Sequence, residues 1–295
     1  MRDQPRVKLY VEGRYRKLSR DLPQTVFYCP ECKGHPRRRR KCEKCEGFGK
    51  LSRDSAQELI GWVLGKAAGT RKHKFHGAGR EDVDVRMLGR GRPFIMELID
   101  PRIPDPDLAE VEALVNSRNE GRLEIQGLHW TEKARVRVVK ETPSAKAYRA
   151  WVEVDGEPDM EAFEKFKGER QVLAQKTPER VAHRRADLTR ERWIELHGMV
   201  PVLEWQGAGN DPLWSGEEEP KEGQYVVDLV TQHGTYVKEF ISGEDGKTDP
   251  ALGESLGGVA CRCLRLDVMD ILGEEGEAPK APKPRPQSNT FGMGL

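Results

Sequence analysis

The stretch His76–Leu98, with the sequence HGAGREDVDVRMLGRGRPFIMEL, carries the most information about the fold and chemistry of this chain. Two sets of side chains alternate along it: Asp82, Asp84 and Arg86 on one side, and Val83, Val85 and Met87 on the other. A period of two predicts a strand with one buried face. The glycines just before Asp82 free the backbone, so a catalytic carboxylate could be held where this strand begins.

Two simpler interpretations of the same carboxylates stay open. The stretch predicts equally well a surface strand whose acids pair with Arg80 and Arg86, because ion pairs are common and catalytic residues are few. Asp82 and Asp84 could also bind magnesium, which would suggest a metal-dependent nuclease. That hypothesis needs further carboxylates nearby, and the two arginines argue against it.

Four cysteines near the N-terminus form two CxxC pairs, Cys29 with Cys32 and Cys42 with Cys45. Four thiolates at this spacing can meet at one tetrahedral zinc, and in a cytosolic protein zinc is favoured over disulfides. Such a zinc would be structural, because four sulfurs leave no position for water. A redox-active pair is the alternative, and the long arginine-rich spacer leaves open whether both pairs share one metal.

Charge is balanced over the whole chain but not locally. The 295 residues have a formal net charge of +1, and 34% of them are charged. Basic residues gather in three clusters: Pro36–Lys41, Arg71–Lys74 and Arg180–Arg192. Binding of phosphates needs a basic surface rather than a basic protein, so these clusters favour a nucleic-acid partner. No apolar run is long enough to cross a bilayer and the N-terminus lacks a signal peptide, so a cytoplasmic location is expected.

The pattern of apolar residues predicts an α+β fold around a mostly antiparallel mixed sheet, preceded by a small zinc-binding module. Three parts are expected: the zinc module over 1–51, a catalytic domain over 52–272 and a disordered tail over 273–295. Strands are expected at Phe94–Ile99, Leu123–Leu128, Ala134–Val139, Tyr148–Val154, Tyr225–Val230, Thr235–Phe240 and Arg262–Met269. Helices are expected at Ser55–Leu64, Asp107–Asn116, Asp159–Lys167 and Thr189–Leu196.

Several motifs in order resemble one enzyme family. They are GRED, VDVRMLG and GRPF within His76–Leu98, then Val11–Leu18, Gln24-Thr25, Gln175–Pro178, His183–Asp187, Gly234–Phe240 and Leu266–Val268. Together they resemble the archaeal and eukaryotic tRNA pseudouridine synthases that act on positions 54 and 55 of the TΨC arm. The resemblance covers nearly the whole chain and implies a pseudouridine-synthase-like catalytic domain that needs no organic cofactor.

The resemblance also implies roles for individual residues. Asp82 matches the catalytic aspartate, with Asp84 as its rival, and Lys238 matches the basic residue that pairs with it. Tyr148 resembles the tyrosine that packs on the flipped base, where its hydroxyl could relay a proton. The remaining expected contacts are apolar walls from Val237 and Leu264, a phosphate or vacated-base contact from Arg80, and backbone contacts from His183, Arg184 and Arg185.

Family members usually carry a large THUMP-containing RNA-binding domain before the catalytic part. Only Met1 to Tyr28 precede the first cysteine, so the chain is interpreted as a short or truncated form. The expected partner is the TΨC arm of tRNA, and the expected state is a monomer. A non-catalytic, zinc-containing RNA-binding protein is the alternative function.

Overall fold

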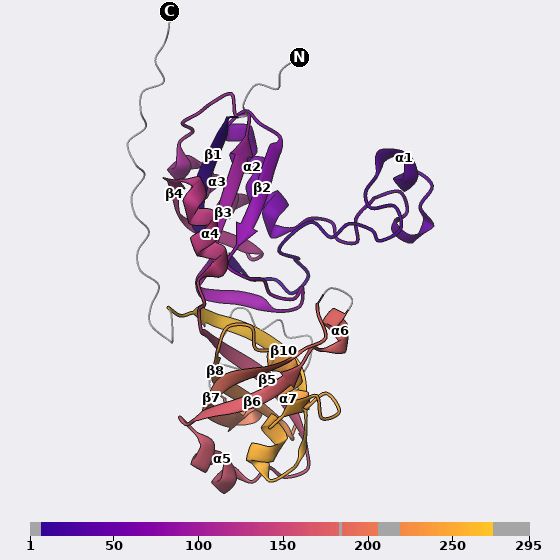
Figure 1. The fold of residues 1–295 in the computed structure, drawn as a ribbon, viewed down its shortest axis with the longest axis vertical. Helices are drawn as coiled ribbons and strands as arrows, with labels where there is room; N and C mark the ends of the chain where they lie inside the picture. The colour runs from indigo at the N-terminus through magenta and orange to yellow at the C-terminus, as the bar shows by residue number, and fades with distance from the viewer. Residues whose placement is uncertain (1–6, 183–184, 206–218, 274–295) are drawn as a thin grey trace, which may run out of the picture. The chain divides into compact units, whose positions relative to one another are not determined.

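The computed structural model describes residues 7–182, 185–205 and 219–273, and Figure 1 shows their fold. Its contacts divide the chain between Thr142 and Pro143 into unit 1, which precedes this point, and unit 2, which follows it. The division falls inside the part predicted to be one catalytic domain, and the predicted three-part organisation stays a prediction. The predicted tail lies, from residue 274 onward, outside the described residues.

Unit 1 is built on four antiparallel strands in the spatial order β4-β1-β3-β2. The strands are β1 (Lys8–Lys17), β2 (Lys72–Gly77), β3 (Arg86–Ile99) and β4 (Leu123–Thr131). One face is covered by α2 (Ala56–Ala67) and α3 (Leu108–Arg118), which pack on Val11, Tyr15 and Phe94. On the other face α4 (Lys133–Glu141) packs Val139 against Tyr10 and Ile95.

Local capping explains why the two predicted helices of unit 1 form where they do. The Ser55 hydroxyl accepts a hydrogen bond from the Glu58 amide at 3.3 Å, and the Asp107 carboxylate accepts one from the Ala109 amide at 2.8 Å. Ser and Asp are preferred at this position because they satisfy amides that have no partner within the helix. The predictions for Ser55–Leu64 and Asp107–Asn116 are confirmed, although α2 continues into the predicted connection, to Ala67.

Unit 2 contains six antiparallel strands in the order β10-β5-β8-β7-β6-β9. Its strands are β5 (Lys146–Asp155), β6 (Arg170–Lys176), β7 (Thr189–Pro201), β8 (Gln224–Thr231), β9 (Thr248–Asp249) and β10 (Ala260–Ile271). Its helices are α5 (Met160–Phe166), α6 (Glu179–Ala182) and α7 (Val237–Ser242), with short 3-10 turns at Val202–Glu204 and Leu252–Leu256. The predicted α+β class with a mostly antiparallel sheet is confirmed. No helix in the described parts of the chain is long and apolar enough to span a membrane.

Three of the elements expected outside the His76–Leu98 stretch are wrong. Ala134–Val139 was expected as a strand and lies in α4. Val136 and Val139 pack against the sheet and are three residues apart, which is the spacing of one helix face, while Val138 is exposed. Thr189–Leu196 was expected as a helix and lies in β7, where Ile194 and Leu196 are buried with a period of two. Pairing with β6 on one side and β8 on the other supplies the backbone hydrogen bonds of β7.

The third wrong element is the expected strand Thr235–Phe240. The chain turns at Gly234, which has φ +77°, and α7 begins at Val237. This position favours glycine because a side chain at positive φ is strained. Lys238 therefore projects from the first turn of a helix and not from a strand.

Candidate active site and metal centre

The GRED motif lies in the loop between β2 and β3. The predicted strand over Asp82–Met87 is wrong in its first half, because regular strand structure begins only at Arg86. Val83 is 38% exposed and Arg86 only 4%, so these two residues depart from the predicted faces, whereas Val85 and Met87 are buried as predicted. Asp82 is half-buried and sits just before a turn over Val83 and Asp84.

A buried lysine fixes the backbone of this loop. Lys17, at the end of β1, donates hydrogen bonds from Nζ to the carbonyls of Asp82 at 3.0 Å and Val83 at 2.6 Å. A third hydrogen bond reaches the Leu22 carbonyl at 3.0 Å. Burial lowers the pKa of Lys17 to about 8, while the negative charges of Glu81 and Asp84 act in the opposite direction. These contacts to two successive carbonyls orient the segment that carries the candidate catalytic carboxylate.

Glu81 anchors the same loop from the other side. Its carboxylate lies 2.7 Å from Arg92 Nε as an ion pair, and both side chains are 1% exposed. The Tyr15 hydroxyl donates to Glu81 at 2.8 Å, and burial raises the pKa of Tyr15 so that it stays protonated. Gln24 donates to the Tyr15 hydroxyl at 2.8 Å and to the Gly79 carbonyl at 2.9 Å. Each charge in this network has a partner, as buried charges require.

Sequence reasoning placed Tyr15, Lys17, Gln24, Glu81 and Arg92 inside matching motifs but gave them no role in fixing the loop. One signal was available, because Val11, Gly13, Tyr15 and Lys17 share a face of β1 at a period of two. A lysine at the end of a strand, on the same face as apolar residues, is a candidate for a buried side chain that donates to backbone carbonyls. Its two acceptors in the GRED loop, 65 and 66 residues away, could not be found from spacing.

Arg80 and the candidate residues of unit 2 differ in their exposure and in the elements that carry them. Arg80 is exposed and has no side-chain hydrogen bond or ion pair among the described residues. Tyr148 is half-buried in β5, where it lies opposite Leu229 of β8 and Val268 of β10. Leu264 is half-buried at a bulge of β10, between Cys263 and Arg265.

The other two candidates of unit 2 lie at the start of α7, which packs against β10. Val237 is 3% exposed and so offers little surface to a ligand, whereas Lys238 is half-buried. The structure thus brings Tyr148, Leu264 and the start of α7 onto neighbouring elements of unit 2. Asp82 and Arg80 belong to unit 1.

A buried amide fixes the turn that leads into α7. Gln175 of β6 donates from Nε2 to the Tyr236 carbonyl at 2.9 Å and accepts from the Tyr236 amide at 2.9 Å. The side chain of Gln175 thereby pairs with a backbone residue as a neighbouring strand would. Gln175 is the first residue of the QKTP motif, to which the sequence analysis assigned no role. Through Gln175 this motif fixes the backbone of Tyr236, two positions before Lys238.

The third basic cluster is only partly available for phosphate. Arg180 pairs with the buried Glu239 of α7, with one contact at 3.1 Å. Arg190 donates to the Thr177 hydroxyl at 2.9 Å. Arg185 is exposed without a side-chain partner among the described residues, whereas His183 and Arg184 lie outside them.

The four predicted ligand cysteines converge. The sulfurs of Cys29, Cys32, Cys42 and Cys45 all lie within 4.8 Å of one another. Cys29 and Cys42 are 3.7 Å apart, as are Cys32 and Cys45. Sulfurs bound at 2.3 Å to a tetrahedral zinc would be separated by about 3.8 Å, so the cluster fits a single ion. The arrangement of the four sulfurs therefore suits one ion shared by both CxxC pairs.

Two similar turns build the cluster. Each CxxC pair is followed by a residue and a glycine at positive φ: Lys33 and Gly34 in the first turn, Glu46 and Gly47 in the second. The Gly49 amide donates to the Cys45 sulfur at 3.1 Å, as expected for glycine turns that direct amides at thiolates. We call the segment from Cys29 to Gly49, which these turns fold, the cysteine lobe. Between its two CxxC pairs, the residues of α1 (Pro36–Arg39) are exposed (Figure 1).

The motifs, the α+β fold and the four-cysteine cluster agree with one family, whose model, described as "Pus10, C-terminal", matches residues 10–272. The chain belongs to the Pus10 C-terminal family. This match includes the candidate residues of both units as well as the cysteine cluster.

Curated relatives of this family are named tRNA pseudouridine synthase Pus10. The protein from Methanopyrus kandleri is 41% identical over 273 residues, which cover 91% of this chain and 57% of the relative. That from Korarchaeum cryptofilum is 39% identical over 269 residues, or 90% and 66% of the two chains. The chain thus spans less than two thirds of the length of these relatives.

Among solved structures, a Cbf5-Nop10-Gar1 complex matches with a TM-score of 0.38 and 16% identity. The match covers 91% of this chain and 59% of that one. A likeness this distant says nothing about the candidate residues.

Proposed function

We propose that this chain isomerises uridine to pseudouridine in tRNA, at position 54, 55 or both in the TΨC arm, with Asp82 as the catalytic carboxylate. Family membership and the names of the relatives support the reaction class. The motif resemblance supports the choice of uridine and of residues. The enzyme is proposed to act as a monomer in the cytoplasm.

One structural observation carries the assignment of Asp82. A loop between two strands is ordinarily a mobile segment, yet here three buried charged side chains fix it. Lys17 donates to the carbonyls of Asp82 and Val83, and Glu81, a residue of the loop itself, pairs with Arg92 of β3. Burying charges costs free energy, and such a network is expected where a side chain must be held in a defined position.

The proposed chemistry requires no cofactor. The bond between uracil N1 and ribose C1′ breaks, and a bond forms between C5 and C1′. C5 loses a proton and N1 gains one, so substrate and product are isomers. A uridine must leave its stack to reach the carboxylate, as in other enzymes that modify bases. Asp82 acts as the nucleophile on C1′ or on the uracil ring.

The other assignments follow the same resemblance. Lys238 would favour the ionised form of Asp82 through its positive charge. Tyr148 would stack on the base and relay the proton lost from C5, and Val237 and Leu264 would line its apolar side. Arg80, which is exposed and unpaired among the described residues, would hold a phosphate of the flipped nucleotide, with Arg185 and its neighbours His183 and Arg184 on the backbone.

Zinc is proposed at the four cysteines. Cys29, Cys32, Cys42 and Cys45 would fill all four tetrahedral positions, so the ion would stabilise the lobe and take no part in the reaction. The pseudouridine reaction should therefore continue in the presence of a chelator unless loss of zinc unfolds the protein.

The test is pseudouridine mapping on an unmodified tRNA transcript, with Asp82→Asn and the neighbouring Asp84→Asn as a matched pair. Wild type and Asp84→Asn should form product without magnesium, and Asp82→Asn should bind tRNA but lose at least about a thousandfold in rate. Activity in Asp82→Asn together with inactivity in Asp84→Asn would move the catalytic role to Asp84. Product at one position or at both identifies the uridine.

The alternative function is a non-catalytic RNA-binding protein. It is favoured by exposed Arg37–Lys41 on the cysteine lobe, which suit phosphate contacts whether or not chemistry follows. Tight tRNA binding without product in the mapping experiment would support it. A magnesium-dependent nuclease is disfavoured, because among the described residues no group of three metal-ligating side chains includes Asp82 or Asp84.

A further inference from the structure

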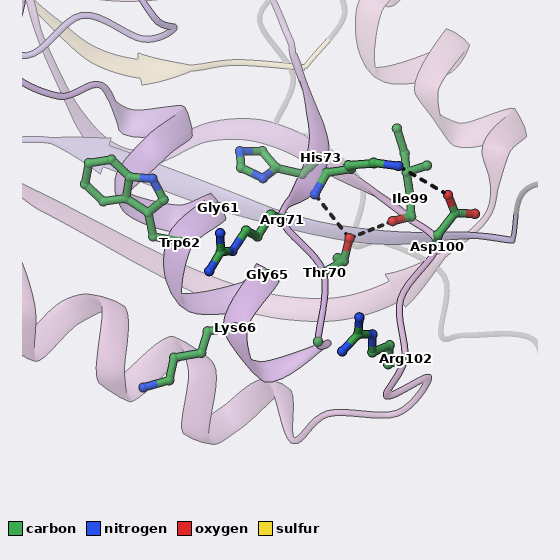
Figure 2. A pocket seen from close by; sticks show the side chains of 12 residues that line it. Gly61, Trp62, Gly65, Lys66, Thr70, Arg71, His73, Ile99, Asp100 and Arg102 are labelled. Carbon is green, nitrogen blue, oxygen red and sulfur yellow. Dashed lines mark hydrogen bonds and ion pairs between the residues drawn. The ribbon is translucent and has the colours of Figure 1, made fainter. Parts of the chain in front are cut away.

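The second basic cluster of the sequence, Arg71–Lys74, has no role in the proposed chemistry, yet the structure gives it a cavity. A hollow of about 1100 Å³ lies in unit 1 between α2, the start of β2 and the residues just after β3 (Figure 2). Its lining includes Lys66 and Trp62 from α2, Arg71 and Lys72 before and within β2, and Arg102 after β3.

Two glycines of α2 allow β2 to lie close to the helix and so shape this hollow. A Cβ on Gly61 would lie 2.3 Å from Nε2 of His73, and one on Gly65 would lie 2.7 Å from the Thr70 carbonyl. The Thr70 hydroxyl donates to the Ile99 carbonyl at 2.6 Å and accepts from the Lys72 amide at 3.1 Å. These contacts hold the residues before β2 against α2 and β3, and Lys66, Arg71 and Arg102 project from three different segments (Figure 2).

The hollow is cationic, and its charges are largely uncompensated. Four Lys or Arg side chains line it against one carboxylate, Asp100. Lys66, Arg71 and Arg102 are exposed and make no ion pair in the parts of the chain that the structure describes. The carboxylate oxygen of Asp100 lies 4.0 Å from Lys72 Nζ, which is a long distance for an ion pair. Burial lowers the pKa of His73, so the lysines and arginines supply the positive charge.

An exposed aromatic side chain lines the same hollow as these cations. Trp62 is 54% exposed, which is unusual for so large an apolar ring on a folded surface. The nearest cation with a ring contact is Lys50, whose Nζ lies 6.0 Å from the ring centroid, at the outer limit of a cation–π interaction. Cations for phosphates beside a free ring for a base are the two elements from which grooves for single-stranded nucleic acid are made.

We propose that this hollow binds a single-stranded segment of RNA, with phosphates held by Lys66, Arg71 and Arg102 and a base stacked on Trp62. An acidic peptide would use the cations but not the exposed ring, so the combination favours RNA. The inference rests on the proposed function only in taking the substrate tRNA as the source of that RNA. The contacts proposed here, to phosphates and to the face of a base, do not depend on base sequence.

The experiment compares two double variants of the full chain that each remove two positive charges. Lys66→Ala/Arg71→Ala changes the hollow, and Arg118→Ala/Lys133→Ala is the matched control, since both control residues are exposed and unpaired in the described part of unit 1. Binding of an unmodified tRNA transcript is measured from low to high salt. The hollow variant should bind about tenfold more weakly at moderate salt and lower the slope of log K against log salt by about 1.4 to 1.8.

Stacking is tested at Trp62 with a single-stranded RNA oligonucleotide. Trp62→Phe should retain affinity, whereas Trp62→Ala should lose about tenfold. The fluorescence quenching that RNA causes in wild type should be reduced in Trp62→Phe, which lacks this indole. Inorganic phosphate, polyglutamate and anionic vesicles are the competing probes, and RNA should outcompete each of them at equal charge concentration.

Equal salt slopes for the hollow and control variants would overturn the inference, because the charge would then act through the general field of the protein. Competition by polyglutamate or vesicles equal to that of RNA would overturn it as well. Pseudouridine yield in the same samples separates this inference from the proposed function. Normal yield with unchanged binding in the hollow variant refutes the hollow alone, and the expected binding losses without any product in wild type refute the function alone.

Discussion

The loop that carries Asp82 and the turn that precedes Lys238 are both held by a buried polar side chain from a neighbouring strand, but with opposite electrostatics. Lys17 holds the Asp82 loop with a charged group on two of its carbonyls and on the carbonyl of Leu22. Gln175 holds the Tyr236 turn with a neutral amide that both donates and accepts. A charged clamp is stronger but depends on protonation, whereas an amide clamp is weaker and insensitive to pH.

The largest effect is expected where the charged network loses its carboxylate. Glu81→Gln keeps the shape of the side chain but removes the negative charge that lies 2.7 Å from Nε of Arg92, which is 1% exposed. Removing one partner of a buried pair costs about 3–5 kcal/mol, so urea unfolding should show a loss of that size together with loss of activity. Glu124→Gln, which breaks the half-exposed pair with Arg16, is the control and should cost less than about 1 kcal/mol. Equal losses in the two variants would contradict the structural role of Glu81.

Removal of the charged clamp itself should have the next largest effect. Lys17→Met removes the donor that the carbonyls of Leu22, Asp82 and Val83 share, although that of Asp82 keeps the Val85 amide at 3.2 Å. The free energy of unfolding should therefore fall by about 2–3 kcal/mol. Displacement of Asp82 by about 1 Å should lower kcat by about a hundredfold while tRNA affinity changes little. Lys133→Met is the control, because Lys133 is exposed at the start of α4. A fall in affinity with unchanged kcat would instead make Lys17 an RNA contact.

Removal of the amide clamp should be milder. Gln175→Ala loses both hydrogen bonds to the Tyr236 backbone, at a cost of about 1–2 kcal/mol, and should lower kcat by about tenfold. Gln126→Ala removes an exposed amide that makes a single hydrogen bond to the Arg90 carbonyl, and it should change neither quantity. Unfolding energies and single-turnover rates measure the difference. If Gln175→Ala is indistinguishable from Gln126→Ala, the turn before Lys238 does not depend on this amide.

The smallest effect concerns pH, and it distinguishes the two clamps directly. The pKa of Lys17 is lowered by burial to about 8, from an unfolded-state value of about 10.4. Between these values the unfolded chain binds a proton that the native chain has released, so the contribution of Lys17 to stability rises with pH. From pH 7 to about 9.5, wild type should gain on the order of 1–2 kcal/mol relative to Lys17→Met.

Activity should change with pH in the opposite sense. A neutral amine has two N–H groups for three carbonyls, so the Asp82 loop loosens and kcat should fall as pH rises through about 8. Gln175→Ala should retain this decline, and Lys17→Met should lack it. A pH profile that is the same in Lys17→Met and wild type would assign the decline to another group.

How much of the site could be predicted depends on the range of the interactions involved. The cysteine ligands and the GRED motif could be recognised from short spacings. The strand expected at Asp82 was wrong because Lys17 takes two carbonyls that a strand would have used for pairing. The strand expected at Thr235–Phe240 was wrong because Gln175, about sixty residues away, pairs with Tyr236 and α7 follows. In both cases a distant side chain overrides a local alternation of apolar residues.

The sequence by itself determined the features that depend on neighbouring residues: the four converging cysteines, the helices capped by Ser55, Asp107 and Asp159, and the family of the chain. Only the tertiary structure decided which charges are buried, as for Lys17, Glu81 and Arg92, and that Arg71 and Trp62 meet at one hollow. The physical reason is that capping and metal spacing act within a few residues, whereas burial of a charge depends on partners that only folding brings together.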